Sequence, residues 1–219
     1  MLYFQAMRRF LLFLLTCGIA GAAAPVALFN GRDLTGWELA TDPRTDIALT
    51  CHVTDGGVLA VTGKPVGYLV TADSYANYRL HVEYRWPADA AKNSNSGVLV
   101  HIATGPVAPK PWPVCFQIQT KINRAGDLLP MAGAKFAETL SSDPGAATPQ
   151  LERMGLVSEK ALGEWNSVDI VCRGRTVLVS VNGVSQNKIT RCEPHAGQIG
   201  IQLEGFPFEL RNLQLTPLN

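Results

Sequence analysis

The sequence lacks any excess of charge of one sign. Over 219 residues it holds 19 Lys and Arg against 18 Asp and Glu, a formal net charge of +1 at pH 7. No segment collects basic residues, whereas proteins that bind nucleic acid usually concentrate them in a patch or a stripe. We therefore expect no nucleic-acid partner.

The sequence also lacks sustained helical periodicity. No stretch repeats apolar residues at the spacing of an amphipathic helix, and there is no internal repeat and no low-complexity segment. Many short strand-like segments without helices between them favour an all-β architecture.

A long apolar run occurs once, near the N-terminus. Residues 1–6, which include the letters LYFQ, have the form of a remnant of a cleavable expression tag and are set aside. Residues 7–24 then indicate a signal peptide, with Arg8 and Arg9 before an apolar segment at 10–19 and small residues after it. The apolar segment is shorter than the roughly 20 residues that a membrane-spanning helix needs.

A signal peptide predicts an exported protein, periplasmic or extracellular, without a membrane span. A lipid anchor on Cys17 is the alternative, although the preceding Thr16 is a poor residue for a lipoprotein signal. Residues 25–219 are expected to form one domain, because all-β sandwiches of this length are commonly single domains.

Cysteine is scarce as well. Beyond the signal peptide four cysteines remain, and their spacing fits no zinc motif. In an oxidising compartment Cys172 and Cys192, which flank a predicted hairpin, are the best-placed pair for a disulfide. Four buried thiols are the alternative.

Short strand-like segments separated by Gly, Asn, Asp and Pro fill the rest of the chain. Residues 78–86 alternate apolar and polar side chains, as in a strand with one buried face. Asn182 and Gly183 stand between two such segments and predict a two-residue hairpin turn. Residues 126–162 are irregular and contain several Pro and Gly, and a loop of that length is usually functional or mobile. The pattern predicts a β-sandwich of the jelly-roll kind.

Polar side chains gather in two neighbouring strand-like segments. Asn95 precedes the first segment and His101 stands at its end, while the second carries Gln117 and Gln119. Positions i and i+2 of a strand point to the same face, so the two carboxamides lie side by side. This arrangement predicts a polar cleft that binds a polyhydroxylated ligand.

Several segments in order resemble one family, the 3-keto-disaccharide hydrolases, formerly a domain of unknown function. They are LFNGRDLTGW at 28–37, NSGV at 95–98, GEWN at 163–166 with VNG at 181–183, GIQLEG at 200–205 and ELRNL at 209–213. The resemblance covers nearly the whole chain after the signal peptide. It implies a concanavalin A-like lectin/glucanase jelly roll, often exported, that cleaves sugars oxidised at C3.

The sequence departs from this family at one position of the predicted cleft. Where many members carry Glu-x-Gln, this chain has Gln117-Ile118-Gln119. A carboxamide cannot act as a base or hold a cation as a carboxylate does. This departure puts a catalytic or metal-binding role at residue 117 in doubt.

Cleavage of a 3-keto sugar starts at C2, because the ketone acidifies the C2 proton. A base removes that proton and the enediolate expels the C1 substituent, so the site needs a base, an electrophile and a proton donor. His101 is the predicted base, since an imidazole titrates near neutral pH; a strand-end histidine bonded to a loop is the alternative. Glu204 and Asp127 are the predicted acid or orienting carboxylate.

Six residues are predicted to bind the substrate: Asn95, Gln117, Gln119, Gln202, Trp112 and Lys121. The amides suit sugar hydroxyls, the tryptophan suits stacking on a sugar ring, and the lysine suits a developing enediolate. The sequence shows no metal-binding triad. The one cofactor that these residues would suit is calcium, held by His101, Glu204 and amide oxygens.

The sequence therefore predicts an exported enzyme that cleaves 3-keto-glycosides. A non-catalytic carbohydrate-binding module with the same cleft is the first alternative, and Gln117 favours it. An interaction domain of the cell envelope and a conventional glycosidase with two carboxylates are the others.

Overall fold

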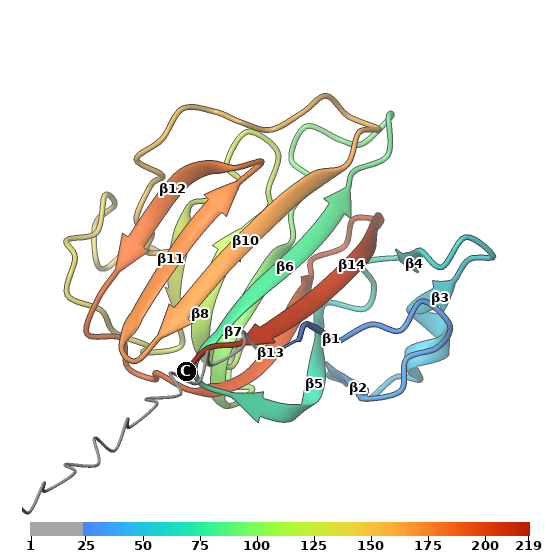
Figure 1. Cartoon of the computed structure of the whole chain (residues 1–219), viewed down its shortest axis with the longest axis horizontal. Coiled ribbons are helices and arrows are strands. Elements are labelled where there is room, and N and C mark those ends of the chain that lie inside the picture. The colour runs from blue at the N-terminus through green and yellow to red at the C-terminus, as the bar shows by residue number, and fades with distance from the viewer. Residues whose placement is uncertain (1–23) are drawn as a thin grey trace, which may run out of the picture.

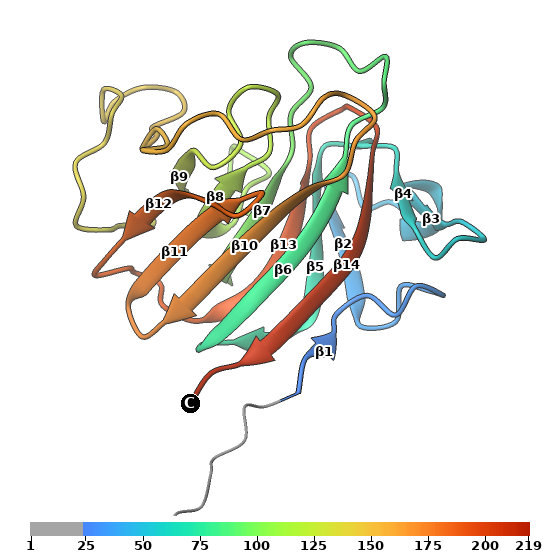
Figure 2. The same ribbon diagram turned by 45° about the horizontal axis from the view of Figure 1, so that its top comes forward.

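Two antiparallel sheets lie one on the other, with the hydrophobic core between them (Figures 1 and 2). The computed structural model describes residues 24–219. The predicted tag remnant and the predicted signal peptide up to residue 23 lie outside the described residues. Within the described range, no helix is long and apolar enough to cross a bilayer.

The larger sheet runs in the order β12 (Val184–Ile189), β11 (Thr176–Val181), β10 (Asn166–Arg173), β6 (Tyr78–Arg85), β14 (Phe208–Pro217), β4 (Leu59–Val61) and β3 (Cys51–Val53), with β1 (Val26–Ala27) beside β14. The smaller sheet runs in the order β2 (Trp37–Thr41), β5 (Gly67–Tyr75), β13 (Gly197–Leu203), β7 (Gly97–Thr104), β8 (Val114–Gln119) and β9 (Leu128–Met131). A 3₁₀ turn, η1 (Ile47–Leu49), precedes β3. The chain is thus the predicted all-β sandwich.

The patterning of two segments explains how the larger sheet forms. Along β6 the apolar residues from Tyr78 to Tyr84 are buried at every second position, with partly exposed polar residues between them, so one face packs on the core. The predicted hairpin joins β11 to β12, and Asn182 and Gly183 both have positive φ, 49° and 79°, as a type I′ turn requires. Both predictions are confirmed.

The cysteines are part of this core. Cys51, Cys115, Cys172 and Cys192 are all buried and all free. The predicted disulfide between Cys172 and Cys192 is therefore wrong, and the alternative of four buried thiols is confirmed. Burial raises the pKa of each thiol, so these side chains behave as small apolar residues.

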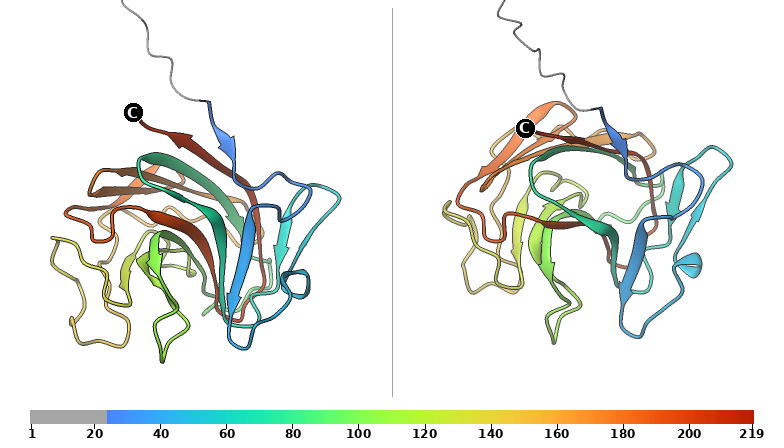
Figure 3. Two further views of the ribbon diagram at one scale, coloured as in Figure 1. Left: turned by 90° about the horizontal axis from the view of Figure 1, so that it is seen from below. Right: turned by 60° about the horizontal axis from the view of Figure 1, so that its bottom comes forward.

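Two loops project from the free face of the smaller sheet (Figure 3). One joins β7 to β8 and the other follows β9, within the predicted irregular segment 126–162. Lys110 in the first loop donates a hydrogen bond from Nζ to the carbonyl oxygen of Ala147 in the second, at 2.9 Å. The linked loops form a wall beside the sheet, and the cleft lies against this wall.

Candidate functional site

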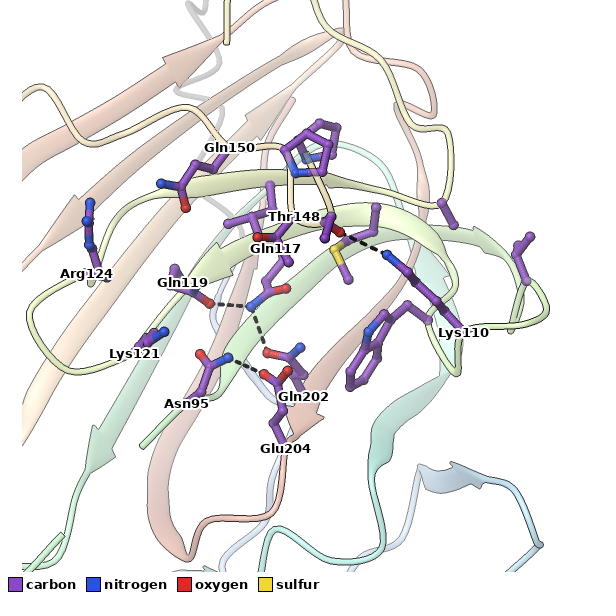
Figure 4. A pocket seen from close by; sticks show the side chains of 18 of the residues that line it. Asn95, Lys110, Gln117, Gln119, Lys121, Arg124, Thr148, Gln150, Gln202 and Glu204 are labelled. Carbon is purple, nitrogen blue, oxygen red and sulfur yellow. Dashed lines mark hydrogen bonds between the residues drawn. The ribbon is translucent and has the colours of Figure 1, made fainter. Parts of the chain in front are cut away.

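A cleft of about 530 Å³ lies on the free face of the smaller sheet, over β8 and β13 (Figure 4). Seven of the nine predicted site residues line it: Asn95, Trp112, Gln117, Gln119, Lys121, Gln202 and Glu204. They come from four separate parts of the chain, so the smaller sheet brings together residues that are far apart in sequence.

The floor of the cleft is a network of three buried carboxamides. Gln117 Nε2 donates to Gln119 Oε1 and also to Gln202 Oε1, the latter at 2.7 Å. Because both carbonyl oxygens accept from Gln117, the NH₂ groups of Gln119 and Gln202 are left to donate to a ligand. The floor of the cleft therefore presents two fixed hydrogen-bond donors, the NH₂ groups of Gln119 and Gln202.

Gly97 makes this network possible. Strand β7 lies between β8 and β13, so the side chain of Gln117 must cross over β7 to reach Gln202. A Cβ atom at Gly97 would lie 2.7 Å from Cγ and 2.8 Å from Nε2 of Gln117, closer than real contacts allow. The preceding Ser96 donates from Oγ to the main-chain oxygen of Gln202 at 2.7 Å. The Ser and Gly of the Asn-Ser-Gly motif are therefore explained by the structure: Ser96 bonds the main chain of β13, and Gly97 leaves room for Gln117.

Glu204 follows the last residue of β13 and is half-buried at the edge of this floor. Asn95 Nδ2, from the same motif, donates a hydrogen bond to its Oε2. Burial raises the pKa of the Glu204 carboxyl, while the nearby Lys121 ammonium and the Asn95 hydrogen bond act in the opposite direction. Among the described residues that line the cleft, Glu204 is the one carboxylate.

The sequence reasoning missed four polar residues of the cleft, Lys110, Arg124, Thr148 and Gln150. Lys110 stands two residues before Trp112, and Arg124 stands three residues after Lys121, so proximity to a predicted residue was the available signal. For Thr148 and Gln150 no local signal exists, because both belong to the loop after β9. Which residues lie near them in space depends on how that loop folds back over the cleft.

His101 is not part of the cleft, contrary to the prediction that it is the base. Alternation along β7 would place it on the cleft face with Gly97 and Leu99. Instead the register shifts after Val100, and His101 takes a left-handed conformation with φ of 57°. This bulge turns the ring into the core, where it is fully buried.

The surroundings of His101 are those of a core residue. Its ring packs edge-on against Tyr78 and Phe116, with ring centroids 6.1 and 6.3 Å apart, and neither ring nitrogen has a hydrogen-bond partner among the described residues. Burial lowers the pKa of His101 to about 4. A neutral imidazole without access to the cleft cannot reach a substrate there.

Asp127 does not line the cleft either. Its side chain is 1% exposed, and Oδ1 accepts a hydrogen bond from the main-chain nitrogen of Arg153 at 2.9 Å. Arg124 and Arg153 lie 3.6 and 3.7 Å from its carboxylate oxygens. Burial raises the pKa of Asp127 even so. Its role is to anchor the segment after β9.

The residues considered for a calcium ion lie in different parts of the structure. His101 points into the core, and the carbonyl oxygens of Gln119 and Gln202 already accept from Gln117. Their NH₂ groups, which repel a cation, are the parts left for a ligand. Among the described residues, no group of three or more His, Cys, Asp or Glu is placed to hold a metal ion.

Solved structures share the fold. A crystal structure of a putative glycosyl hydrolase from Parabacteroides distasonis superposes with a TM-score of 0.65 at 20% identity, covering 89% of this chain and 94% of that chain. The carbohydrate-binding module CBM66 from Bacillus subtilis superposes with a TM-score of 0.54 at 8% identity, covering 83% and 95%. A Bacillus licheniformis β-glucanase gives 0.53 at 12% identity, covering 91% and 100%. At these identities the likeness shows the concanavalin A-like fold alone.

Comparison with curated proteins found no match. A family model, described as the 3-keto-alpha-glucoside-1,2-lyase-like domain, matches residues 24–216. This range includes all of the sandwich except the last residue of β14, and every residue of the cleft floor. The match agrees with the motifs at 28–37, 95–98 and 200–205. The chain therefore belongs to the 3-keto-alpha-glucoside-1,2-lyase-like domain family.

Proposed function

We propose that the protein cleaves 3-keto-glycosides by elimination, with Glu204 as the base. The observation that carries the proposal is the half-buried carboxylate of Glu204, oriented by Asn95, at the edge of a floor of fixed amide donors. This assignment replaces His101, which the bulge in β7 turns away from the cleft.

The first step moves the C2 proton of the sugar to a carboxylate oxygen of Glu204. The electrons of the C2–H bond form a C2=C3 double bond, and the ketone oxygen gains negative charge. The free NH₂ groups of Gln119 and Gln202 suit that oxygen, because donors fixed before reaction stabilise developing charge most effectively. Lys121 adds a positive charge nearby.

In the second step the enediolate re-forms the ketone and expels the oxygen on C1, leaving a C1=C2 double bond. The leaving oxygen takes the proton that Glu204 had accepted. Addition of water to the double bond would then complete a net hydrolysis. A raised pKa suits Glu204 to both proton transfers, because a base works best when its pKa lies near the working pH.

Two features disfavour a conventional glycosidase. That reaction needs two carboxylates on opposite sides of the scissile bond, and among the described cleft residues Glu204 stands alone. Gln117 occupies the position at which a second carboxylate was expected from the family pattern, and it is committed to two hydrogen bonds.

The test is turnover of a chromogenic glucoside and its 3-keto derivative, with and without chelator. We expect release from the keto sugar only, with loss of the C2 hydrogen of the sugar as the C1=C2 double bond forms, and a loss of about 10²- to 10⁴-fold in kcat for Glu204→Gln. Glu193→Gln, which removes an exposed carboxylate outside the cleft, is the matched control. Turnover that survives in Glu204→Gln would remove Glu204 from the mechanism.

A carbohydrate-binding module is the second candidate, and Gln117 is the observation that favours it. A floor of three amides binds hydroxyls without any reaction, and Trp112 at the wall supplies a stacking surface. Saturable sugar binding without release from either glucoside would support this function. In either case we propose that the protein is exported to the periplasm or the cell exterior, as the sequence of residues 7–24 suggests.

A further inference from the structure

Two cations occupy one end of the cleft. Lys121 and Arg124 come from a single turn after β8, in which the main-chain nitrogen of Arg124 donates to the oxygen of Lys121 at 2.8 Å. Figure 4 shows both side chains at the same end of the cleft, on the side of Gln119. The turn thus places a guanidinium and an ammonium at the same end of the cleft.

The charge of the cleft is unbalanced even though the chain is nearly neutral. Among its described lining residues, Lys110, Lys121 and Arg124 are positive and Glu204 is negative. The whole sequence, in contrast, has a formal net charge of +1. Positive charge is therefore concentrated in the cleft by the fold.

The partners of Arg124 leave part of its guanidinium free. Nη1 lies 2.7 Å from Glu152 Oε1 and 3.6 Å from Asp127 Oδ2. Both contacts use the same nitrogen, and among the described residues neither Nε nor Nη2 has a partner. A guanidinium holds a carboxylate through two parallel N–H groups, so Nε and Nη2 can bind a second anion.

The positive charge of Lys121 is compensated even less than that of Arg124. It is half-buried, and among residues 24–219 its ammonium makes no hydrogen bond or ion pair. The charge that it influences is Glu204, whose pKa it lowers. An ammonium held this way in a cleft favours an anion brought by the ligand.

We propose that this end of the cleft binds an anionic substituent of the sugar, so that the ligands of the protein are acidic glycosides. Arg124 would grip the anion through Nε and Nη2, and Lys121 would add charge from the adjacent position. The inference rests on the proposed function in that the ligand is a sugar. A carboxylate on a uronic acid and a sulfate ester share the required chemistry.

Calorimetric titration with unreactive disaccharides tests the proposal. The three ligands share one linkage and differ at C6 of one ring, which carries a hydroxyl, a carboxylate or a sulfate. We expect at least one acidic ligand to bind about tenfold more tightly than the neutral one, with a preference that weakens as salt is added. The better acidic ligand identifies which anion the site takes.

The variants assign the preference to the turn. Arg124→Gln should remove most of the preference while the neutral ligand binds as before, and Arg124→Lys should retain part of it, because lysine keeps the charge but not the fork. Arg175→Gln is the matched control, since Arg175 is an equally exposed arginine paired with a glutamate outside the cleft. It should leave the preference intact.

Equal affinity for acidic and neutral ligands, or an equal loss of both in Arg124→Gln, would overturn the proposal. So would the absence of measurable binding by all three ligands. Binding needs no turnover, so the result is independent of the role of Glu204. A preference that persists while Glu204→Gln remains active would refute the catalytic proposal and leave this one standing.

Discussion

The two ends of strand β7 carry polar residues that the structure uses in opposite ways. At its start Asn95, Ser96 and Gly97 build the site: one orients Glu204, one bonds the main chain of β13, and one makes room for Gln117. Near its end, His101 lies in the core, with its ring packed edge-on against Tyr78 and Phe116.

The difference between these two ends is a single irregularity of the backbone. Between these two ends, β7 has one extra residue opposite Ile199 of β13. Beyond this point, each side chain of β7 points to the face opposite to the one that regular alternation would give it. A β-bulge of this kind changes where each later side chain points. A residue type suited to catalysis therefore indicates a site only when its direction is known.

The largest effect is expected at the His101 end, in acid. The pKa of His101 is lowered to about 4 in the folded protein by burial, below the value of about 6.5 in an unfolded chain. Between these values the unfolded state binds more protons, so the free energy of unfolding should fall as pH drops, by about 3 kcal/mol in total. Denaturant unfolding of the wild-type protein and of His101→Asn from pH 7 to pH 4 measures this.

Asparagine is the matched replacement because it tolerates a positive φ and does not titrate. The variant should lose this part of the pH dependence. An unchanged slope of stability against pH in His101→Asn would show that other groups cause the acid sensitivity.

The next effect is expected at the start of β7. Gly97→Ala would place a Cβ atom against Gln117 and against the main-chain oxygen of Ile118, so we expect a loss of about 1–3 kcal/mol in the free energy of unfolding together with weaker sugar binding. Gly56→Ala is the control, because the nearest atom to its Cβ is 3.9 Å away. Normal stability and normal binding in Gly97→Ala would contradict the conclusion that there is no room for a side chain at residue 97.

A smaller effect is expected for the amide that crosses the strand. Gln117→Met keeps the length of the side chain but removes both donated hydrogen bonds, which leaves two buried carbonyl oxygens unpaired and should cost about 1–2 kcal/mol of stability. Sugar affinity should fall because Gln119 and Gln202 are no longer fixed. Gln214→Met, at an exposed position of β14, serves as the control; equal behaviour of the two variants would show that the network does not matter.

The smallest effect is expected on the kcat of a variant of His101. Because the ring does not reach the cleft, His101→Asn should keep the kcat of the wild-type protein at neutral pH within a few-fold. Turnover of the 3-keto glucoside measures this. A loss of 100-fold or more, in a variant shown to be folded, would return His101 to the mechanism.

Much of the fold could be read from local patterns. Alternation predicted β6, the Asn182-Gly183 pair predicted the turn between β11 and β12, and the density of short strands predicted the sandwich. These features depend on neighbours in sequence, because side chains of a strand alternate between faces and few residues accept positive φ. The same rule correctly placed Gln117 and Gln119 side by side.

The composition of the cleft required the tertiary structure. Gln117 reaches Gln202 because β7 is the strand between them and because Gly97 of β7 lies where the side chain of Gln117 crosses. That Gln150 lines the cleft while Asp127 turns to Arg153 depends on how the segment after β9 folds back. Sequence alone determined the fold and the chemical character of the site, because periodicity and turn chemistry are local. Strand order, the bulge at His101 and the packing of long loops decided which residues form it, because these depend on contacts between distant parts of the chain.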